Sequence, residues 1–212
     1  MTTPKLQIAL DVWTLDEAFR ILDEVADYID IIEAGTPLVL NSGIASLVSI
    51  KNSYPNKEFV IDAKITDESY IAKKAFDAGA DYTTVLGILS KESVLAALNQ
   101  GKKASKEVIV DLMNVQDKLK KSEEVKKLGA HYVLVHCGLD EQSLGKTPLA
   151  ELKRIKQNLD IKVAVAGGIN LNTIEDYIAA NADIIVVGNA LVKDSNRKNV
   201  AQKMKDKIRA VH

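Results

Sequence analysis

The sequence predicts a single α/β domain over residues 1–212, folded as a (β/α)8 barrel, the TIM-barrel architecture. Apolar runs rich in β-branched residues recur eight times, and amphipathic helical patterns separate them. The runs begin roughly every 25 residues, the length of one strand, one helix and two short loops. No linker or change in composition interrupts this repeat.

Eight segments are predicted to be strands: Leu6–Asp11, Ile29–Gly35, Glu58–Ile65, Asp81–Gly87, Glu107–Met113, His131–Gly138, Lys162–Gly168 and Ile184–Leu191. Several of them are nearly continuous in apolar residues, which is typical of parallel strands covered on both faces. A doubly wound open sheet also alternates strand and helix. The count of eight and the absence of Gly-x-Gly-x-x-Gly after the first strand favour the barrel.

The helices between these strands carry recognisable start and stop signals. Thr14 precedes Asp16 and Glu17 in a pattern resembling a capping box, and apolar residues follow at helical spacing. Gly79 and Gly129 stand just past predicted helix ends, where a left-handed backbone favours glycine. An amphipathic helix over residues 199–211 is expected to cap the barrel.

Composition excludes several classes of protein. The chain is 47% hydrophobic and 27% charged, which excludes an extended disordered chain. The net charge of −1 provides no global field for nucleic acid or an anionic membrane. No segment approaches a membrane span of ~20 apolar residues, and no signal-peptide core precedes Asp11, so a cytoplasmic location is expected. The single cysteine, Cys137, excludes an internal disulfide framework and a multi-cysteine zinc site.

Polar side chains stand on or at the ends of otherwise apolar strands, where barrel enzymes carry their chemistry. A lone charged residue there could form a structural ion pair, but several converging from separate strands favour catalysis. These candidates are Asp11, Glu33, Asp62, Lys64, Asp111 and His136.

Asp62 and Lys64 are two residues apart on one strand, so both are expected to point to the same side of the sheet. A buried structural salt bridge fits this spacing as well as a catalytic pair does. Glu33 on the neighbouring strand favours a cation site, because two adjacent carboxylates repel each other without one. Oxygen ligands of this kind suit Mg²⁺, which we expect at Glu33 and Asp62.

Glycines follow two late strands, with Gly167 and Gly168 after the seventh and Gly188 before Asn189 on the eighth. Ordinary turn chemistry would explain one glycine pair, but both loops together predict a phosphate site. His136 is the candidate for proton transfer, because its unperturbed pKa of about 6.5 suits neutral pH. Cys137 alternates away from it and is expected outside the barrel, with no nucleophilic role.

The segment Asp62-Ala63-Lys64-Ile65-Thr66-Asp67 matches the Asp-x-Lys-x-x-Asp signature of the orotidine-monophosphate-decarboxylase-like superfamily. Five further segments resemble its 3-hexulose-6-phosphate synthase branch. They are Leu6-Gln7-Ile8-Ala9-Leu10-Asp11, Ile31-Ile32-Glu33-Ala34-Gly35-Thr36-Pro37, Val110-Asp111-Leu112, Val135-His136-Cys137-Gly138-Leu139-Asp140-Glu141-Gln142 and Val165-Ala166-Gly167-Gly168-Ile169. The resemblance extends over essentially the whole chain.

This resemblance implies a Mg²⁺-dependent, reversible aldol reaction that joins formaldehyde to the sugar phosphate D-ribulose 5-phosphate through an enediolate. By position, Glu33 and Asp62 would bind the metal, Lys64 would stabilise the enediolate, and His136 would carry the proton. Asp11 would bind substrate hydroxyls, and Asp111 would support the polar cluster. Asp67 would reach into the active site of a second copy, which implies a homodimer.

Other functions stay open at this point. The related branch of 3-keto-L-gulonate-6-phosphate decarboxylases typically has arginines where this chain has Leu139 and Asn189, and these absences favour the synthase. Orotidine-phosphate decarboxylase fits poorly, because Glu68 and Ser69 replace its usual Ile-Pro pair. An epimerase would need several histidines at the strand ends. A non-catalytic sugar-phosphate-binding barrel would not need the charged set. Glu68, Asn114 and Asn189 depart from the usual synthase pattern.

Overall fold

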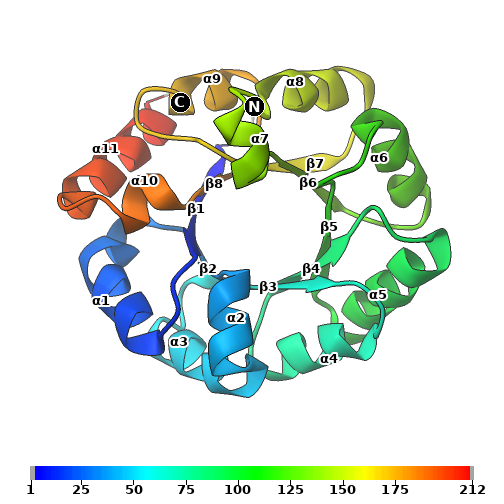
Figure 1. The fold of residues 1–212 in the computed structure, drawn as a ribbon, viewed down its shortest axis with the longest axis horizontal. Coiled ribbons are helices and arrows are strands. Elements are labelled where there is room, and N and C mark those ends of the chain that lie inside the picture. Colours follow the sequence, from blue (N-terminus) through cyan, green and yellow to red (C-terminus); the bar gives the residue numbers. More distant parts are fainter. Residues whose placement is uncertain (1–2, 211–212) are drawn as a thin grey trace.

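The computed structural model describes residues 3–210 and folds them into a closed barrel of parallel strands surrounded by helices (Figure 1). In this part of the chain the strands are β1 (Lys5–Leu10), β2 (Ile31–Ala34), β3 (Glu58–Ile65), β4 (Tyr82–Leu86), β5 (Glu107–Asp111), β6 (Tyr132–His136), β7 (Lys162–Ala166) and β8 (Ile184–Val187). Each strand pairs in parallel with the next, and β8 pairs with β1 to close the ring. The predicted barrel is confirmed.

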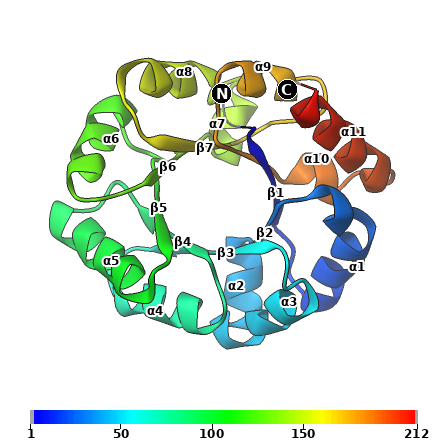
Figure 2. The same cartoon turned by 180° about the vertical axis from the view of Figure 1, so that it is seen from behind.

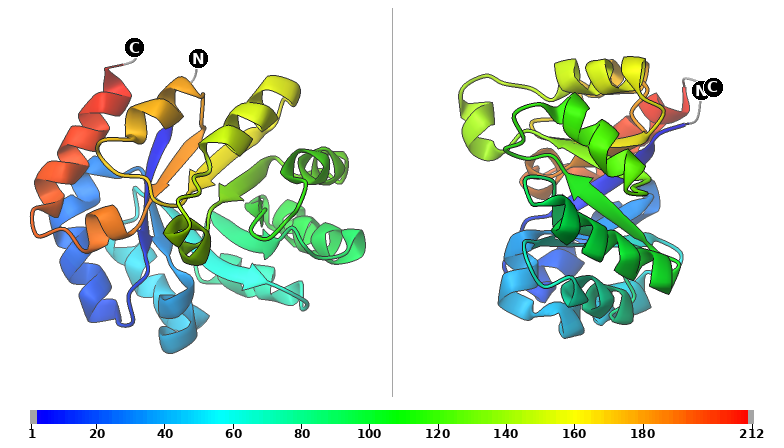
Figure 3. Two further views of the ribbon diagram at one scale, coloured as in Figure 1. Left: turned by 45° about the horizontal axis from the view of Figure 1, so that its top comes forward. Right: turned by 90° about the vertical axis from the view of Figure 1, so that its right-hand side faces the viewer.

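The helices form an outer layer around the strands, as both face-on views show (Figures 1 and 2). They are α1 (Leu15–Val25), α2 (Thr36–Ser42), α3 (Val48–Ser53), α4 (Tyr70–Asp77), α5 (Lys91–Ala104), α6 (Lys118–Lys127), α7 (Leu139–Ser143), α8 (Leu149–Asn158), α9 (Ile174–Ala179), α10 (Asn189–Val192) and α11 (Arg197–Arg209), with short 3₁₀ turns at Ala26–Tyr28 and Ile44–Leu47. The last helix, α11, packs beside α1 and β1, so the two ends of the described chain lie close together (Figure 3).

The predicted helix signals are confirmed. Thr14 accepts a hydrogen bond from the N–H of Glu17 and begins α1. Gly79 and Gly129 follow α4 and α6 with φ of 91° and 97°. The predicted closing helix corresponds to α11, although the last predicted residue, Val211, lies outside the described residues.

The prediction for the eighth strand is wrong at its end. β8 stops at Val187, and residues 189–191, which the prediction placed in the strand, belong to the short helix α10. Gly188 makes the change of direction, with φ of −100° and ψ of −104°. Several other predicted strands also extended a few residues into the following loops, because the apolar pattern continues past the last ladder hydrogen bond.

Alternate residues of each strand fill the barrel interior or contact the helices. Leu6, Ile8 and Leu10 of β1 belong to the apolar layer beneath the helices, whereas Ala9 belongs to the interior cluster. On the period-two pattern of a strand, Gln7 and Asp11 share the interior side with Ala9.

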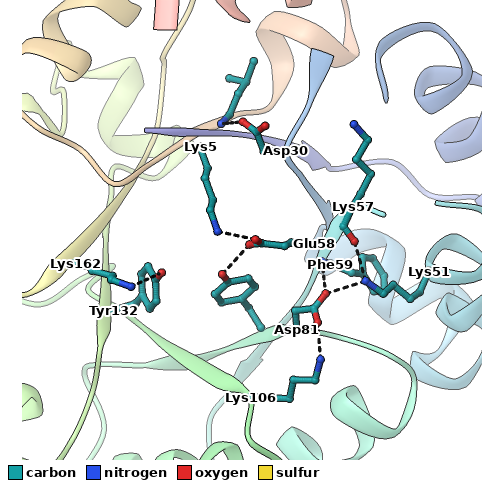
Figure 4. A network of polar contacts seen from close by, with 12 residues as sticks. Lys5, Asp30, Lys51, Lys57, Glu58, Phe59, Asp81, Lys106, Tyr132 and Lys162 are labelled. Carbon is teal, nitrogen blue, oxygen red and sulfur yellow. Dashed lines mark hydrogen bonds and ion pairs between the residues drawn. The ribbon is translucent and has the colours of Figure 1, made fainter. Parts of the chain in front are cut away.

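At the N-terminal end of the barrel, an aspartate precedes β2, β4 and β8 and bonds each of these strands to the strand before it. Asp30 accepts a hydrogen bond from the N–H of Leu6, Asp81 from Phe59 and Asp183 from Val163. Each carboxylate also forms an ion pair with lysine, and Figure 4 shows Asp81 between Lys51 and Lys106. These three aspartate contacts join β1 to β2, β3 to β4 and β7 to β8.

The interior at this end is closed by polar and aromatic side chains. Lys5 donates to Glu58, which also accepts from the Tyr82 hydroxyl (Figure 4). The rings of Tyr82 and Tyr132 meet edge to face with centroids 5.7 Å apart. Donors and acceptors here are matched within the protein, which is the arrangement expected of a structural end of a barrel.

Candidate active site

The six candidate side chains lie at the opposite end, on or just after the carboxyl ends of β1, β2, β3, β5 and β6. The structure links four of them into one chain of contacts, Asp62–Lys64–Asp111–His136. Glu33 and Asp11 lie beside these four residues, because the negative charge of Asp62 raises the pKa of both carboxyl groups. The predicted convergence of these strand ends is therefore confirmed by geometry.

Lys64 is the central cation of the cluster. Its Nζ lies 3.0 Å from Asp62 Oδ2 and 3.1 Å from Asp111 Oδ2. Burial lowers the pKa of Lys64, but the carboxylates of Asp62 and Asp111 outweigh this effect and raise it. Lys64 also has a positive φ of 41°, next to a register irregularity in β3, so the backbone is strained where it presents the ammonium group. The ammonium group is held charged and in place.

Asp111 connects Lys64 to the histidine. Its Oδ2 lies 3.1 Å from His136 Nδ1, and its Oδ1 accepts from the backbone N–H of Met113. Desolvation raises the pKa of Asp111, but the hydrogen bond and charge of His136, together with Lys64, outweigh it and lower the pKa. An ionised Asp111 favours the His136 tautomer with its proton on Nδ1, which leaves Nε2 free to exchange a proton.

Two threonines fix Asp62, and neither was among the predicted site residues. The Thr84 hydroxyl donates to Asp62 Oδ1 at 2.7 Å, and the Thr36 hydroxyl donates to Asp62 Oδ2 at 2.8 Å. Thr84 also accepts from the backbone N–H of Lys64. A signal was present in the sequence, since a buried hydroxyl in the apolar segment 81–87 requires a hydrogen-bond partner.

Glu33 is the most isolated carboxylate of the site. It is 6% exposed, and Gln7 Nε2 donates to its Oε2 at 2.7 Å. Desolvation, followed by the negative charges of Asp62 and Asp11, raises the pKa of Glu33 well above its usual range. Within residues 3–210, no cationic side chain forms an ion pair with this carboxylate to balance its negative charge.

Asp11 stands at the rim, between two glycines. A side-chain carbon at Gly35 would collide with Asp11 Oδ1, and one at Gly188 would lie 3.6 Å from Oδ2. Desolvation and the charge of Asp62 raise the pKa of Asp11, while Lys64 and His136 oppose the rise. The carboxylate is thus close to the cluster and open to a ligand.

The predicted phosphate loops lie beside one another after β7 and β8. Gly167 and Gly168 have φ of 120° and 68°, and a side chain at Gly167 would strike the carbonyl oxygen of Cys137. Among residues 3–210, the backbone N–H groups of Gly168 and Asn189 donate to no protein acceptor. Free N–H groups on a glycine-rich turn suit an anion.

Asp67 remains apart from this cluster in the single chain. It is exposed in the loop between β3 and α4, and no hydrogen bond or ion pair within residues 3–210 joins it to the other candidates. Its predicted role in the site of a second copy stays a prediction.

Cys137 is buried, and its thiol faces the carbonyl of Lys146. His131 lies at the N-terminal end, exposed and paired with Glu107.

The donor set fits a divalent cation that also binds substrate. Four carboxylates face one lysine and one histidine, so a cation would offset the excess negative charge. Within residues 3–210, no three His, Cys, Asp or Glu side chains form a cage that could hold a metal ion alone. Mg²⁺ commonly uses one or two carboxylates and completes its shell with water and substrate oxygens.

The fold and this site define an enzyme class: a (β/α)8 barrel whose strand ends carry acid–base groups beside two glycine-containing loops. The chain belongs to the orotidine 5'-phosphate decarboxylase / HUMPS family, whose model matches residues 4–204. It is 38% identical over 206 residues to the 3-hexulose-6-phosphate synthase of Bacillus subtilis, covering 96% of this chain and 98% of that protein.

Solved structures agree with this assignment. The crystal structure of 3-hexulose-6-phosphate synthase from Salmonella typhimurium superposes with a TM-score of 0.94 and 37% identity, covering 98% of this chain and 100% of that one. The 3-keto-L-gulonate-6-phosphate decarboxylase of Vibrio cholerae gives 0.88 and 25%, covering 99% of each chain. Both share the barrel, and the sequence is more similar to the synthase.

No helix described in residues 3–210 combines the length and apolar character needed to cross a bilayer.

Proposed function

We propose that this protein is a 3-hexulose-6-phosphate synthase, a carbon–carbon lyase that condenses formaldehyde with D-ribulose 5-phosphate reversibly. The observation that carries the proposal is the continuous Asp62–Lys64–Asp111–His136 chain beside the uncompensated Glu33. It supplies a fixed positive charge and a proton carrier within one site. The similarity to named synthases supports the same reaction.

Glu33 and Asp62 would hold Mg²⁺. When bound, Mg²⁺ would act as a Lewis acid toward the carbonyl and adjacent hydroxyl oxygens of the sugar. This role matches the position of Glu33, which is buried at the strand ends and forms no ion pair within residues 3–210.

His136 would remove a proton from C1 of ribulose 5-phosphate and leave an enediolate. The ammonium group of Lys64, held by Asp62 and Asp111, would stabilise the negative charge that develops. C1 then attacks the carbon of formaldehyde, a new C–C bond forms, and the former aldehyde oxygen receives a proton. Asp111 keeps His136 oriented for both transfers.

The remaining predicted residues would bind the substrate. Asp11 at the rim would accept from sugar hydroxyls, and the loops at Gly167, Gly168, Gly188 and Asn189 would donate N–H groups to the phosphate. We include in the proposal a homodimer in which Asp67 completes the site of the second copy. Its exposure in the single chain supports this role. A cytoplasmic location, where phosphorylated sugars are made, belongs to the same proposal.

The test is formaldehyde consumption with ribulose 5-phosphate, run beside CO₂ release from 3-keto-L-gulonate 6-phosphate. EDTA-sensitive loss of formaldehyde with little CO₂ release is expected. The opposite pattern would assign the chain to the decarboxylase branch. Absence of both activities, with sugar-phosphate binding retained, would indicate a non-catalytic barrel.

A further inference from the structure

Gln7 is a buried polar residue that the reaction described above does not use. It is 3% exposed and lies on the interior side of β1, two residues before Ala9. Its register neighbours on β2 and β8 are the apolar Ile31 and Val186. An amide in such surroundings costs free energy unless both of its polar atoms are bonded.

Only half of this amide is satisfied. Gln7 Nε2 donates to Glu33 Oε2 at 2.7 Å, whereas Gln7 Oε1 is the one buried side-chain nitrogen or oxygen within residues 3–210 that has no hydrogen-bond partner. An apolar residue of similar length would fill the position without leaving an acceptor unpaired. Packing alone therefore gives no reason for the glutamine, and the bond to Glu33 is its visible contribution.

The hydrogen bond distinguishes the two oxygens of Glu33. In the register of β1 and β2, Glu33 pairs with Ala9, and Gln7 lies two residues before Ala9, deeper in the barrel. The amide of Gln7 therefore bonds Oε2 from the interior side. Oε1 remains available to a ligand. A carboxylate held in this way loses little conformational freedom when it binds a cation, and such outer partners commonly set metal affinity.

We propose that Gln7 is a positioning residue that holds Glu33 in the orientation in which Oε1 binds the divalent cation. The inference rests on the proposed function, because it requires Glu33 to be a metal ligand. It adds a residue that touches neither metal nor substrate and acts through Glu33 alone.

The test measures metal binding directly. The free Mn²⁺ signal in electron paramagnetic resonance gives the Kd of the metal-free protein for Mn²⁺ in the presence of D-ribulose 5-phosphate. Gln7→Met removes the donor and nearly keeps the side-chain volume, and about 10- to 100-fold weaker Mn²⁺ binding is expected. The Mg²⁺ concentration for half-maximal activity should rise by the same factor, with the KM for ribulose 5-phosphate at saturating Mg²⁺ little changed.

Thr83→Val is the matched control. Thr83 is fully buried on β4, and its hydroxyl donates to the carbonyl of Ile61, away from the site. This variant should lose thermal stability and keep the wild-type Mn²⁺ affinity. If Gln7→Met does not fold, Gln7→Glu is the second variant. It keeps the shape of the side chain but replaces the donating amide with a second carboxyl group facing Glu33, so it should also bind Mn²⁺ more weakly.

The outcomes separate the two proposals. Wild-type Mn²⁺ affinity in a folded Gln7→Met or Gln7→Glu protein would overturn the role of Gln7 and leave the proposed function standing. Weakening in Thr83→Val equal to that in Gln7→Met would also overturn it, because general destabilisation would then explain both. A wild-type protein that binds ribulose 5-phosphate and no Mn²⁺ would contradict the metal site itself, and the inference would fall with it.

Discussion

Acidic residues have opposite roles at the two ends of the barrel. At the N-terminal end, Asp30, Asp81 and Asp183 each accept a backbone N–H and face at least one lysine. At the C-terminal end, four carboxylates share Lys64 and His136. Matched charges stabilise the N-terminal end. At the C-terminal end, the excess of negative charge favours the binding of a cation and a substrate.

The comparison predicts that substitutions at the C-terminal end reduce activity with little loss of stability. The largest effect is expected for Asp62→Ala, which removes the partner of Lys64 and a proposed metal ligand. The kcat/KM for formaldehyde condensation should fall by about 10³-fold or more. Activity assays over a Mg²⁺ series measure this effect, and wild-type turnover would remove Asp62 from the site.

A substitution at the N-terminal end should have the converse effect. Asp81→Ala breaks contacts with Lys51, Lys106 and the N–H of Phe59. Since the site is partly exposed, the expected loss is about 1–2 kcal/mol, or roughly 4 °C in Tm, with kcat/KM unchanged.

The pH dependence of stability tests whether Asp81 acts through its negative charge. The lysines and backbone N–H outweigh desolvation and lower the pKa of Asp81. Its contribution to stability is therefore complete above the unfolded pKa of about 3.9 and is lost as pH falls through the folded pKa. Thermal melts should show the gap between wild type and Asp81→Ala at neutral pH and its closure in acid. A constant gap would contradict the ion-pair explanation.

Glu33→Gln is expected to have a smaller effect of opposite sign. Because the folded pKa of Glu33 is raised, metal-free wild type loses stability as pH rises from the unfolded pKa toward the folded one. The variant avoids this loss and should melt about 2 °C or more above metal-free wild type at pH 7. Calorimetry with and without Mg²⁺ measures this, and Mg²⁺ should no longer stabilise the variant. A lower Tm would show that Glu33 is compensated.

The smallest effect is expected for Leu139→Arg. Leu139 is 69% exposed on α7, outside the charged cluster, so stability should change by no more than about 0.5 kcal/mol. The variant should not improve formaldehyde condensation, because arginine at this position is typical of the decarboxylase branch. Parallel assays of both reactions measure the outcome, and a rise in condensation would contradict the interpretation of this loop.

Much of the fold could be predicted from sequence because its signals are local. Apolar runs define the strands, and the convergence of their ends predicts one site for the charged residues, in which the structure places Lys64 between Asp62 and Asp111. The roles of Gln7, Thr36 and Thr84 could not be predicted in this way. Each contact joins residues more than 20 positions apart and depends on register between strands, which apolar periodicity does not determine.

Local geometry outside the apolar pattern was also beyond prediction. The strained backbone of Lys64 and the turn at Gly188, which ends β8 and begins α10, are backbone conformations that the apolar pattern does not specify. Asp67 is exposed and contacts none of the other candidates within residues 3–210, so its role in a second copy stays a proposal. Periodicity therefore locates the site, whereas the contacts that orient its groups depend on the three-dimensional fold.

The aspartate contacts also bear on how the barrel opens. They join three of the four pairs in which an odd-numbered strand precedes an even-numbered one: β1–β2, β3–β4 and β7–β8. In the fourth such pair, β5–β6, the position before β6 is His131, which is exposed and contacts the side chain of Glu107 on β5 instead of a backbone N–H. The β5–β6 pair therefore lacks the link that secures the others. In hydrogen-exchange measurements, the amides at the N-terminal ends of these two strands should lose protection before their counterparts in the other pairs, making this the seam at which local unfolding starts.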